Sequence, residues 1–184
     1  MRKDSARVEA YGTVDELNSI LGLARTFNES RLDSGDSDEA TQAARELEDI
    51  LKGLQNELFN LGSELATEAG ASYPGMIVVS ETEIATLEKI IDHCQEDLEA
   101  LTSFILPGGD PVSAFLHQAR TVCRRAERDV VRLGAEEELS NEPLRYLNRL
   151  SDLLFVLARW SAKRCGTTEY LWEQGARLAP PSRK

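Results

Sequence analysis

Apolar residues recur at steps of three and four along most of the chain, which is the spacing of amphipathic helices. The most regular run predicts a helix from about Asp38 to Thr67. It is a seam of leucines at Leu47, Leu51, Leu54, Leu58, Leu61 and Leu65. Such a seam would suit a free coiled coil, but it is short and further amphipathic segments follow it, so we expect a helical bundle.

The helix before this seam is predicted to begin at a capping box formed by Thr13 and Glu16 and to end near Phe27. Apolar residues upstream of the box, among them Val8, also allow an earlier start, and that alternative stays open. The polar residues 28–37 predict a loop.

A third helix is predicted after a second capping box, at Ser80 and Glu83, and its apolar positions continue to Leu98. The run Met76–Val79 before it is the only strand-like stretch in the sequence. A last helix follows Asn141, and it is apolar over most of its circumference, which places it in the middle of a bundle.

The segment from Phe104 to Arg128 combines a turn with a charged helix. Gly108 and Gly109 permit a tight turn, and Asp110 followed by a proline is typical of a helix N-terminus. The fourth helix predicted here ends near Gly134. With the other segments, this gives an all-α fold of five helices.

One face of this fourth helix carries Arg120, Arg124, Glu127 and Arg128, at positions i, i+4, i+7 and i+8. A charge run of this kind is often a solvated face paired with carboxylates. Here the run is arginine rather than lysine, and the planar guanidinium suits bidentate binding of phosphate. We therefore expect an anion at this face.

Composition limits the number of domains, the possible partners and the expected location of the protein. The chain has 184 residues, 41% hydrophobic and 29% charged, which predicts one domain over residues 1–184, with an irregular tail over about 166–184. The net charge of −11 argues against nucleic acid or an anionic membrane as partner. Three cysteines without metal-ligand spacing predict reduced thiols in the cytoplasm, and no signal peptide or membrane span is expected.

Several chemistries find no support in the sequence. There is no P-loop motif, no zinc framework and no arrangement typical of a Ser-His-Asp triad. The two histidines, His93 and His117, lack a glutamate three residues upstream, so a di-iron site is not expected. Asn148 and Asp152, one turn apart in the last helix, either meet the arginine face or satisfy each other and the backbone.

Three blocks together resemble the PduO-type ATP:cob(I)alamin adenosyltransferases. They are Val8–Asn18, Phe104–Gly109 with Arg120–Arg128, and Tyr146–Phe155. The resemblance implies a ferritin-like five-helix bundle that forms a homotrimer with active sites between subunits. It implies transfer of the 5′-deoxyadenosyl group of ATP to the cobalt of cob(I)alamin or a related reduced corrinoid, which gives adenosylcobalamin and triphosphate.

The family match also assigns residues. Those matching the ATP site are Lys3, Arg124, Arg125, Glu127, Arg128 and Asn148. Among them, Arg124 is expected at the triphosphate and Asn148 at the nucleoside. Glu127 would orient an arginine or help to hold a magnesium ion.

Phe104 matches the aromatic residue at the lower axial face of the corrinoid, and Phe155 would line the same pocket or pack in the core. Asp15 and Arg120 match an intersubunit salt bridge. The family pattern also has a Gly- and Thr-rich phosphate loop upstream of the position matching Lys3. The 184 residues contain no counterpart of that loop. Either an upstream segment supplies that loop or the phosphate cradle is smaller here.

Other functions and partners follow as expectations. A non-catalytic helical bundle that binds a nucleotide or a partner helix would explain the amphipathic helices and the acidic composition. It would not explain Phe104 and the arginine face together. For an adenosyltransferase, a cob(II)alamin reductase and an adenosylcobalamin-dependent acceptor enzyme are the expected partners.

Overall fold

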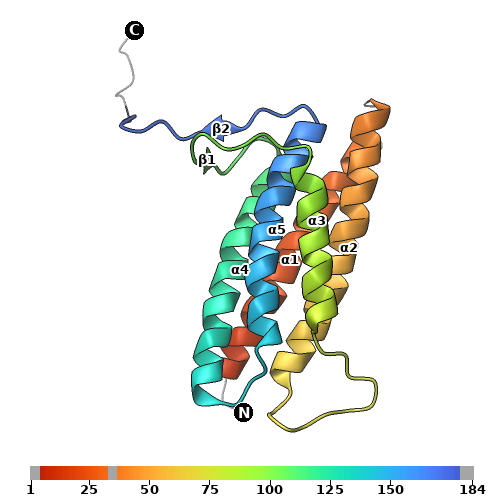
Figure 1. Cartoon of the computed structure of the whole chain (residues 1–184), viewed down its shortest axis with the longest axis vertical. Coiled ribbons are helices and arrows are strands. Elements are labelled where there is room, and N and C mark those ends of the chain that lie inside the picture. Colours follow the sequence, from red (N-terminus) through yellow and green to blue (C-terminus); the bar gives the residue numbers. More distant parts are fainter. Residues whose placement is uncertain (1–4, 33–36, 179–184) are drawn as a thin grey trace.

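The computed structural model of the protein describes residues 5–32 and 37–178. Over these ranges five helices run along one common axis (Figure 1). They are α1 (Ala6–Leu32), α2 (Asp38–Ala66), α3 (Glu81–Gln95), α4 (Pro111–Glu136) and α5 (Glu142–Arg164). The expected five-helix bundle is therefore confirmed. No described helix is long and apolar enough to cross a membrane.

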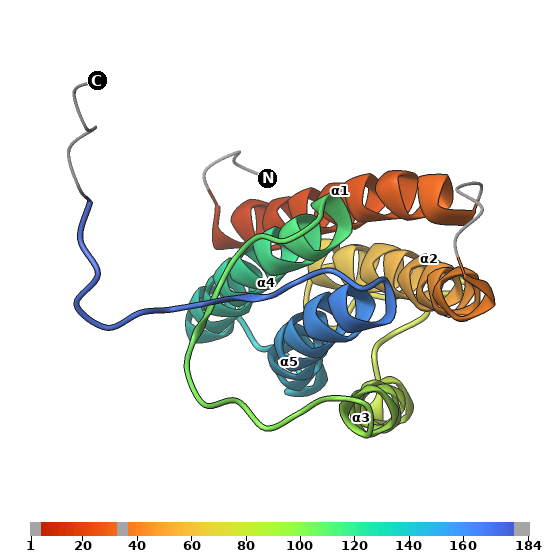
Figure 2. The ribbon, with the colours of Figure 1, turned by 90° about the horizontal axis from the view of Figure 1, so that it is seen from above.

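Seen from above, α1, α2, α4 and α5 form a compact group, and α3 lies outside it beside α5 (Figure 2). The last helix, α5, contacts α2, α3 and α4. It buries side chains around most of its circumference, as the sequence predicts. These include Tyr146, Leu147, Leu150, Leu153, Leu154, Leu157 and Trp160.

The predicted start of the first helix at Thr13 is wrong, and the alternative of an earlier start is confirmed, because α1 begins at Ala6 and passes through Thr13. Thr13 is buried, and its hydroxyl donates to Asp129 Oδ2 of α4 at 2.9 Å rather than capping a helix. The helix also continues past Phe27 to Leu32. Asn28, expected in a loop, is buried in α1 and donates from Nδ2 to the Ala44 carbonyl at 2.7 Å.

Other boundaries follow the sequence closely. Ser37 caps α2, and Ser80 with Glu83 forms the predicted capping box of α3. Asp110 accepts hydrogen bonds from the first backbone N–H groups of α4. The helix α3 ends at Gln95, so Leu98 lies beyond it, although Leu98 still packs against the core.

The strand-like run Met76–Val79 is not a strand. Val79 is buried and its N–H donates to Glu64 Oε2 at 2.9 Å, so a side chain satisfies the backbone there. A two-residue antiparallel pair forms elsewhere, between β1 (Ile105–Leu106) and β2 (Tyr170–Leu171). The second strand lies in the tail that was expected to be irregular.

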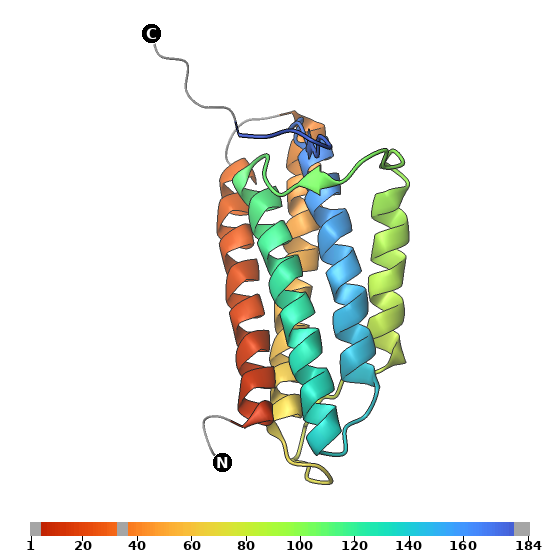
Figure 3. The same cartoon turned by 90° about the vertical axis from the view of Figure 1, so that its left-hand side faces the viewer.

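Asp97, in the loop that follows α3, forms hydrogen bonds with side chains of α5. Its Oδ2 accepts hydrogen bonds from Trp160 Nε1 and from Arg164 Nε, each at 2.9 Å. The hydrogen bonds from Arg164 and Trp160 lower the pKa of the Asp97 carboxyl. The loop that leads to β1 and α4 therefore starts from a fixed point on the end of α5 (Figure 3).

We predict that Asp97→Ala destabilises the fold by about 1–3 kcal/mol, because it leaves the buried N–H of Trp160 without an acceptor. The midpoint of urea unfolding would measure this change. Since the folded-state pKa of Asp97 lies below its ordinary value, its contribution is complete above about pH 4 and is lost as the pH falls through the folded pKa.

The matched control is Asp92→Ala, an exposed position on the last turns of α3. It should change the stability by no more than about 0.5 kcal/mol. Equal destabilisation by the two substitutions would contradict the role of Asp97.

Candidate active site

Three arginines on one face of α4 have no carboxylate partner among the described residues. Arg124 and Arg128 are exposed, and Arg120 is half-buried. Within the described part of the chain, the only side-chain hydrogen bond that these three arginines donate runs from Arg128 Nη1 to the backbone carbonyl of Arg124, at 2.8 Å. Like charges on one face repel, so this arrangement favours an anion from outside the chain. Among the described residues of a single chain, these three arginines are therefore not paired with carboxylates.

Arg125 points elsewhere. Its guanidinium forms a salt bridge with Glu16 of α1, and both side chains are about half exposed. Within one chain, Arg125 is thus the member of the predicted set that is already paired with a carboxylate.

Glu127 and Asn148 join α4 to α5. Asn148 Nδ2 donates to Glu127 Oε1 at 2.9 Å, so the amide meets the charged face of α4 rather than Asp152. Asp152 instead accepts from Arg149 at 3.0 Å. The Glu127–Asn148 pair borders a cavity of about 340 Å³ between α3, α4 and α5, lined also by Ile84, Glu88, Leu144, Arg145 and Arg149.

Further along α4, Arg120 and His117 flank the ring of Phe155. The guanidinium carbon of Arg120 lies 5.8 Å from the ring centroid, and the imidazole of His117 lies 6.1 Å from it. Phe155 is half-buried beside these two side chains. His117 was not expected in the site, and only its i−3 spacing from Arg120 could have indicated it.

Burial lowers the pKa of both members of this pair. It lowers the pKa of His117, and nearby Arg120 lowers it further. Burial also lowers the pKa of Arg120, with a second contribution from Arg124. Arg120 Nε and His117 Nδ1 are buried and have no hydrogen-bond partner among the described residues. A neutral imidazole at His117 thus avoids a further positive charge beside Arg120.

Phe104 stands at the opposite end of α4 from Arg128, in the loop before the helix. The residue is 77% exposed and lies outside the core. Phe115, by contrast, is half-buried and stacks on Phe27 with ring centroids 5.4 Å apart. Over the described ranges, the one ring contact of Phe104 is with Trp172, at 6.0 Å between centroids in an edge-to-face arrangement.

The remaining predicted residues are not brought into this group. Asp15 is exposed on α1 and forms no ion pair with Arg120 within the chain. Lys3 lies outside the described residues. Over the described ranges, no group of three or more His, Cys, Asp or Glu side chains is placed to hold a metal ion.

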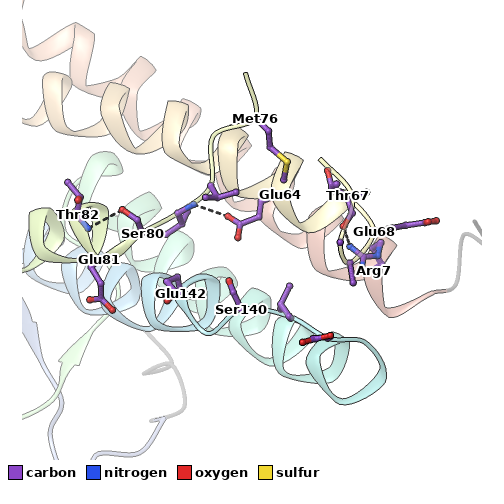
Figure 4. Close-up of a pocket in the computed structure, with 17 residues that line it drawn as sticks. Arg7, Glu64, Thr67, Glu68, Met76, Ser80, Glu81, Thr82, Ser140 and Glu142 are labelled. Carbon is purple, nitrogen blue, oxygen red and sulfur yellow. Dashed lines mark hydrogen bonds between the residues drawn. The ribbon is translucent and has the colours of Figure 1, made fainter. Parts of the chain in front are cut away.

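Another cavity lies at the far end of the bundle from Phe104, and none of the described residues predicted for the site lines it (Figure 4). Its volume is about 940 Å³, and its charged lining is mainly acidic, including Glu64, Glu81 and Glu142. Arg7 is the exception, but its guanidinium donates to the Leu65 carbonyl at 2.5 Å and pairs with a glutamate. A phosphate would meet mostly repulsion there.

Comparison with known proteins identifies related sequences and structures. The chain matches the family model of cobalamin adenosyltransferase over residues 1–161. A cobalamin adenosyltransferase of Cupriavidus metallidurans is 44% identical over 172 residues, which cover 94% of this chain and 83% of that protein. A corrinoid adenosyltransferase of Bacillus subtilis is 42% identical over 176 residues, covering 95% of this chain and 83% of the relative.

Solved structures are similar over nearly the whole chain. A variant of the PduO-type ATP:corrinoid adenosyltransferase from Lactobacillus reuteri, complexed with cobalamin and ATP, has a TM-score of 0.80 at 34% identity. The match covers 95% of this chain and 90% of that one. Another variant of that protein, complexed with ATP, has a TM-score of 0.79 at 35% identity, covering 94% and 90% of the two chains.

Proposed function

The chain belongs to the family of cobalamin adenosyltransferases, and we propose that α4 and the loop before it carry out the family's reaction here. The protein is an ATP:corrinoid adenosyltransferase, which moves the 5′-deoxyadenosyl group of ATP to the cobalt of a reduced corrinoid. The arginine face of α4 would bind the triphosphate. The aromatic residues near the start of α4 would bind the corrinoid.

The chemistry explains why an arginine face is sufficient. Cobalt(I) is a strong nucleophile, and its electron pair forms the new bond to the ribose C5′ carbon. The C5′–oxygen bond breaks, and its electrons leave with the triphosphate. No proton has to be removed from the nucleophile, so the site needs no general base. Negative charge grows on the leaving group, which preorganised cations stabilise.

The observation that carries this proposal is that Arg124 and Arg128 are exposed and unpaired on one face. The chain as a whole has a net charge of −11, so carboxylates are plentiful. None of the described carboxylates forms a salt bridge with these two arginines, and Glu127 on the same face instead accepts a hydrogen bond from Asn148. We assign Arg124 to the triphosphate, with Arg128 one turn further along it. ATP would compete with Glu16 for Arg125.

Glu127 and Asn148 would fix the nucleoside end. The hydrogen bond between them leaves the amide oxygen of Asn148 and the second carboxylate oxygen of Glu127 available. Magnesium bound to ATP usually takes one or two protein carboxylates together with phosphate oxygens, and Glu127 fits that need. The ion would add positive charge beside the phosphates, as the arginines do.

Phe104 would act on the corrinoid. Its exposed ring is free to cover the lower axial face of the macrocycle and to displace the ligand there. Without that axial donor, cobalt(II) is less stabilised, so its reduction to cobalt(I) becomes easier. Phe155, held by Arg120 and His117, would line the same pocket.

We further propose a homotrimer with the sites between subunits. Arg120 is partly desolvated and its buried Nε has no acceptor among the described residues, and Asp15 is exposed without a described partner. A salt bridge from one subunit to the next would satisfy both. The buried thiols of Cys94 and Cys123 fit the cytoplasmic location expected from the sequence. A cob(II)alamin reductase and an adenosylcobalamin-dependent enzyme remain the partners we propose.

We predict that Arg124→Ala lowers kcat about a hundred- to thousand-fold, because one charge-assisted contact to the developing anion is lost. The assay is the formation of adenosylcobalamin from ATP and chemically reduced cobalamin, followed by absorbance. Arg132→Ala is the control, since Arg132 lies on the same helix but pairs with Asp129. Full activity of the folded Arg124 variant would refute the assigned role.

We also predict that the protein is a trimer at micromolar concentration, which light scattering would measure. Asp15→Asn should weaken catalysis without unfolding the protomer, because it removes one partner of the proposed salt bridge. Glu9→Gln, at another exposed acid on α1, should have little effect. A monomeric wild-type protein would contradict the trimer and the intersubunit site together.

A further inference from the structure

The segment after α5 holds the backbone of the loop that carries Phe104. The Trp172 N–H donates to the carbonyl of Phe104 at 2.7 Å, and Ser103 Oγ donates to the carbonyl of Trp172 at 2.8 Å. The strand pair continues this contact, with Ile105 opposite Leu171. The two segments lie next to each other at the end of the bundle in both Figure 1 and Figure 2. The main chain at Phe104 is thus hydrogen-bonded to Trp172, which lies far away in the sequence.

The fit between these segments is close along the glycine turn as well. A Cβ atom on Gly109 would lie 3.2 Å from Thr167 Cγ2, and one on Gly108 would lie 3.8 Å from the Tyr170 ring. Gly109 also has a φ of +99°, which disfavours any other residue. The positive φ and the close approach of Thr167 together favour glycine at position 109.

The ring of Phe104 has little other support. With 77% of its side chain exposed, it has one described ring neighbour, Trp172, at 6.0 Å and an interplanar angle of 68°. A ladder of two residue pairs is too short to hold a side chain by itself. Trp172 is itself 43% exposed, unlike the core residue Trp160 at 1%, so it contributes little to the core.

We propose that Trp172 is a positioning residue that holds Phe104 in the orientation needed at the corrinoid. This inference rests on the role proposed for Phe104. The backbone bond fixes where the Phe104 main chain stands, and the edge-to-face contact restricts the rotamers of its ring. Without the tryptophan ring, Phe104 would spend less time over the lower axial face, and less of the bound cobalt(II) would lose its lower ligand.

The test compares four variants with the wild-type protein. Trp172→Ala removes the ring but keeps the backbone N–H, and Trp172→Phe keeps an aromatic edge. Phe104→Ala reports the role of Phe104 itself. Leu178→Ala is the matched control, because Leu178 follows in the same segment and is fully exposed. Circular dichroism and ATP binding would show that each variant is folded.

Two measurements separate positioning from a general structural role. One is the fraction of bound cob(II)alamin that shows the four-coordinate electronic spectrum in the presence of ATP. The other is turnover from cob(II)alamin with reduced flavin as the electron donor, compared with turnover from preformed cob(I)alamin. We expect Trp172→Ala to lower the four-coordinate fraction and the cob(II)alamin turnover about two- to tenfold, the size of an aromatic pair's coupling. Turnover from cob(I)alamin should change much less.

Recovery by Trp172→Phe, with no effect of Leu178→Ala, would support the proposal. If Phe104→Ala loses the four-coordinate spectrum but Trp172→Ala retains it, Trp172 does not position Phe104 and only this inference fails. An equal loss from both cobalt states in Trp172→Ala would also overturn it. If Phe104→Ala itself keeps the spectrum, the role of Phe104 in the proposed function is wrong, and the inference falls with it.

Discussion

The site depends on one constraint: α4 keeps three guanidiniums on one face while its opposite face is buried. Their mutual repulsion costs stability in the free protein, and it must be offset by the packing of α4 in the bundle. The hydroxyl of Thr13 in α1 donates to Asp129, and the thiol of Cys123 contacts the Leu147 carbonyl of α5 at 3.2 Å. These contacts fix the rotation of α4 about its axis. The same charges are then in place to stabilise an anion without rearrangement.

The length of α4 separates two tasks. Its first residue, Pro111, follows the loop that carries the exposed aromatic ring, and Arg124 lies about 20 Å further along the helix axis. Between these two points along the helix lie Arg120 and His117, with Phe155 of α5 beside them. A corrinoid at the aromatic end and a triphosphate at the arginine face would thus bring cobalt and the ribose carbon together near the middle. One helix with its preceding loop would position both substrates.

Local sequence signals determined most helix ends, because caps such as Ser80 with Glu83 and Asp110 act within a few residues. They failed where a distant partner was stronger. Thr13 has the local pattern of a cap, but the carboxylate that it contacts lies 116 positions away in the sequence. The arginine face was predictable from helical spacing alone. The β1–β2 pair, the Glu127–Asn148 bond and the burial of His117 were not, since each depends on how separate segments meet.

The identity of the phosphate product tests the central claim most directly. The protein would be mixed with magnesium, ATP and chemically reduced cobalamin, and the products would be followed by ³¹P NMR and by absorbance. If the arginine face stabilises a triphosphate that leaves the ribose carbon, intact triphosphate and adenosylcobalamin should appear in equal amounts. Without the corrinoid, ATP should remain intact. Bound ATP with no adenosylcobalamin formed, or release of ADP and phosphate instead, would contradict the account and favour a nucleotide-binding bundle.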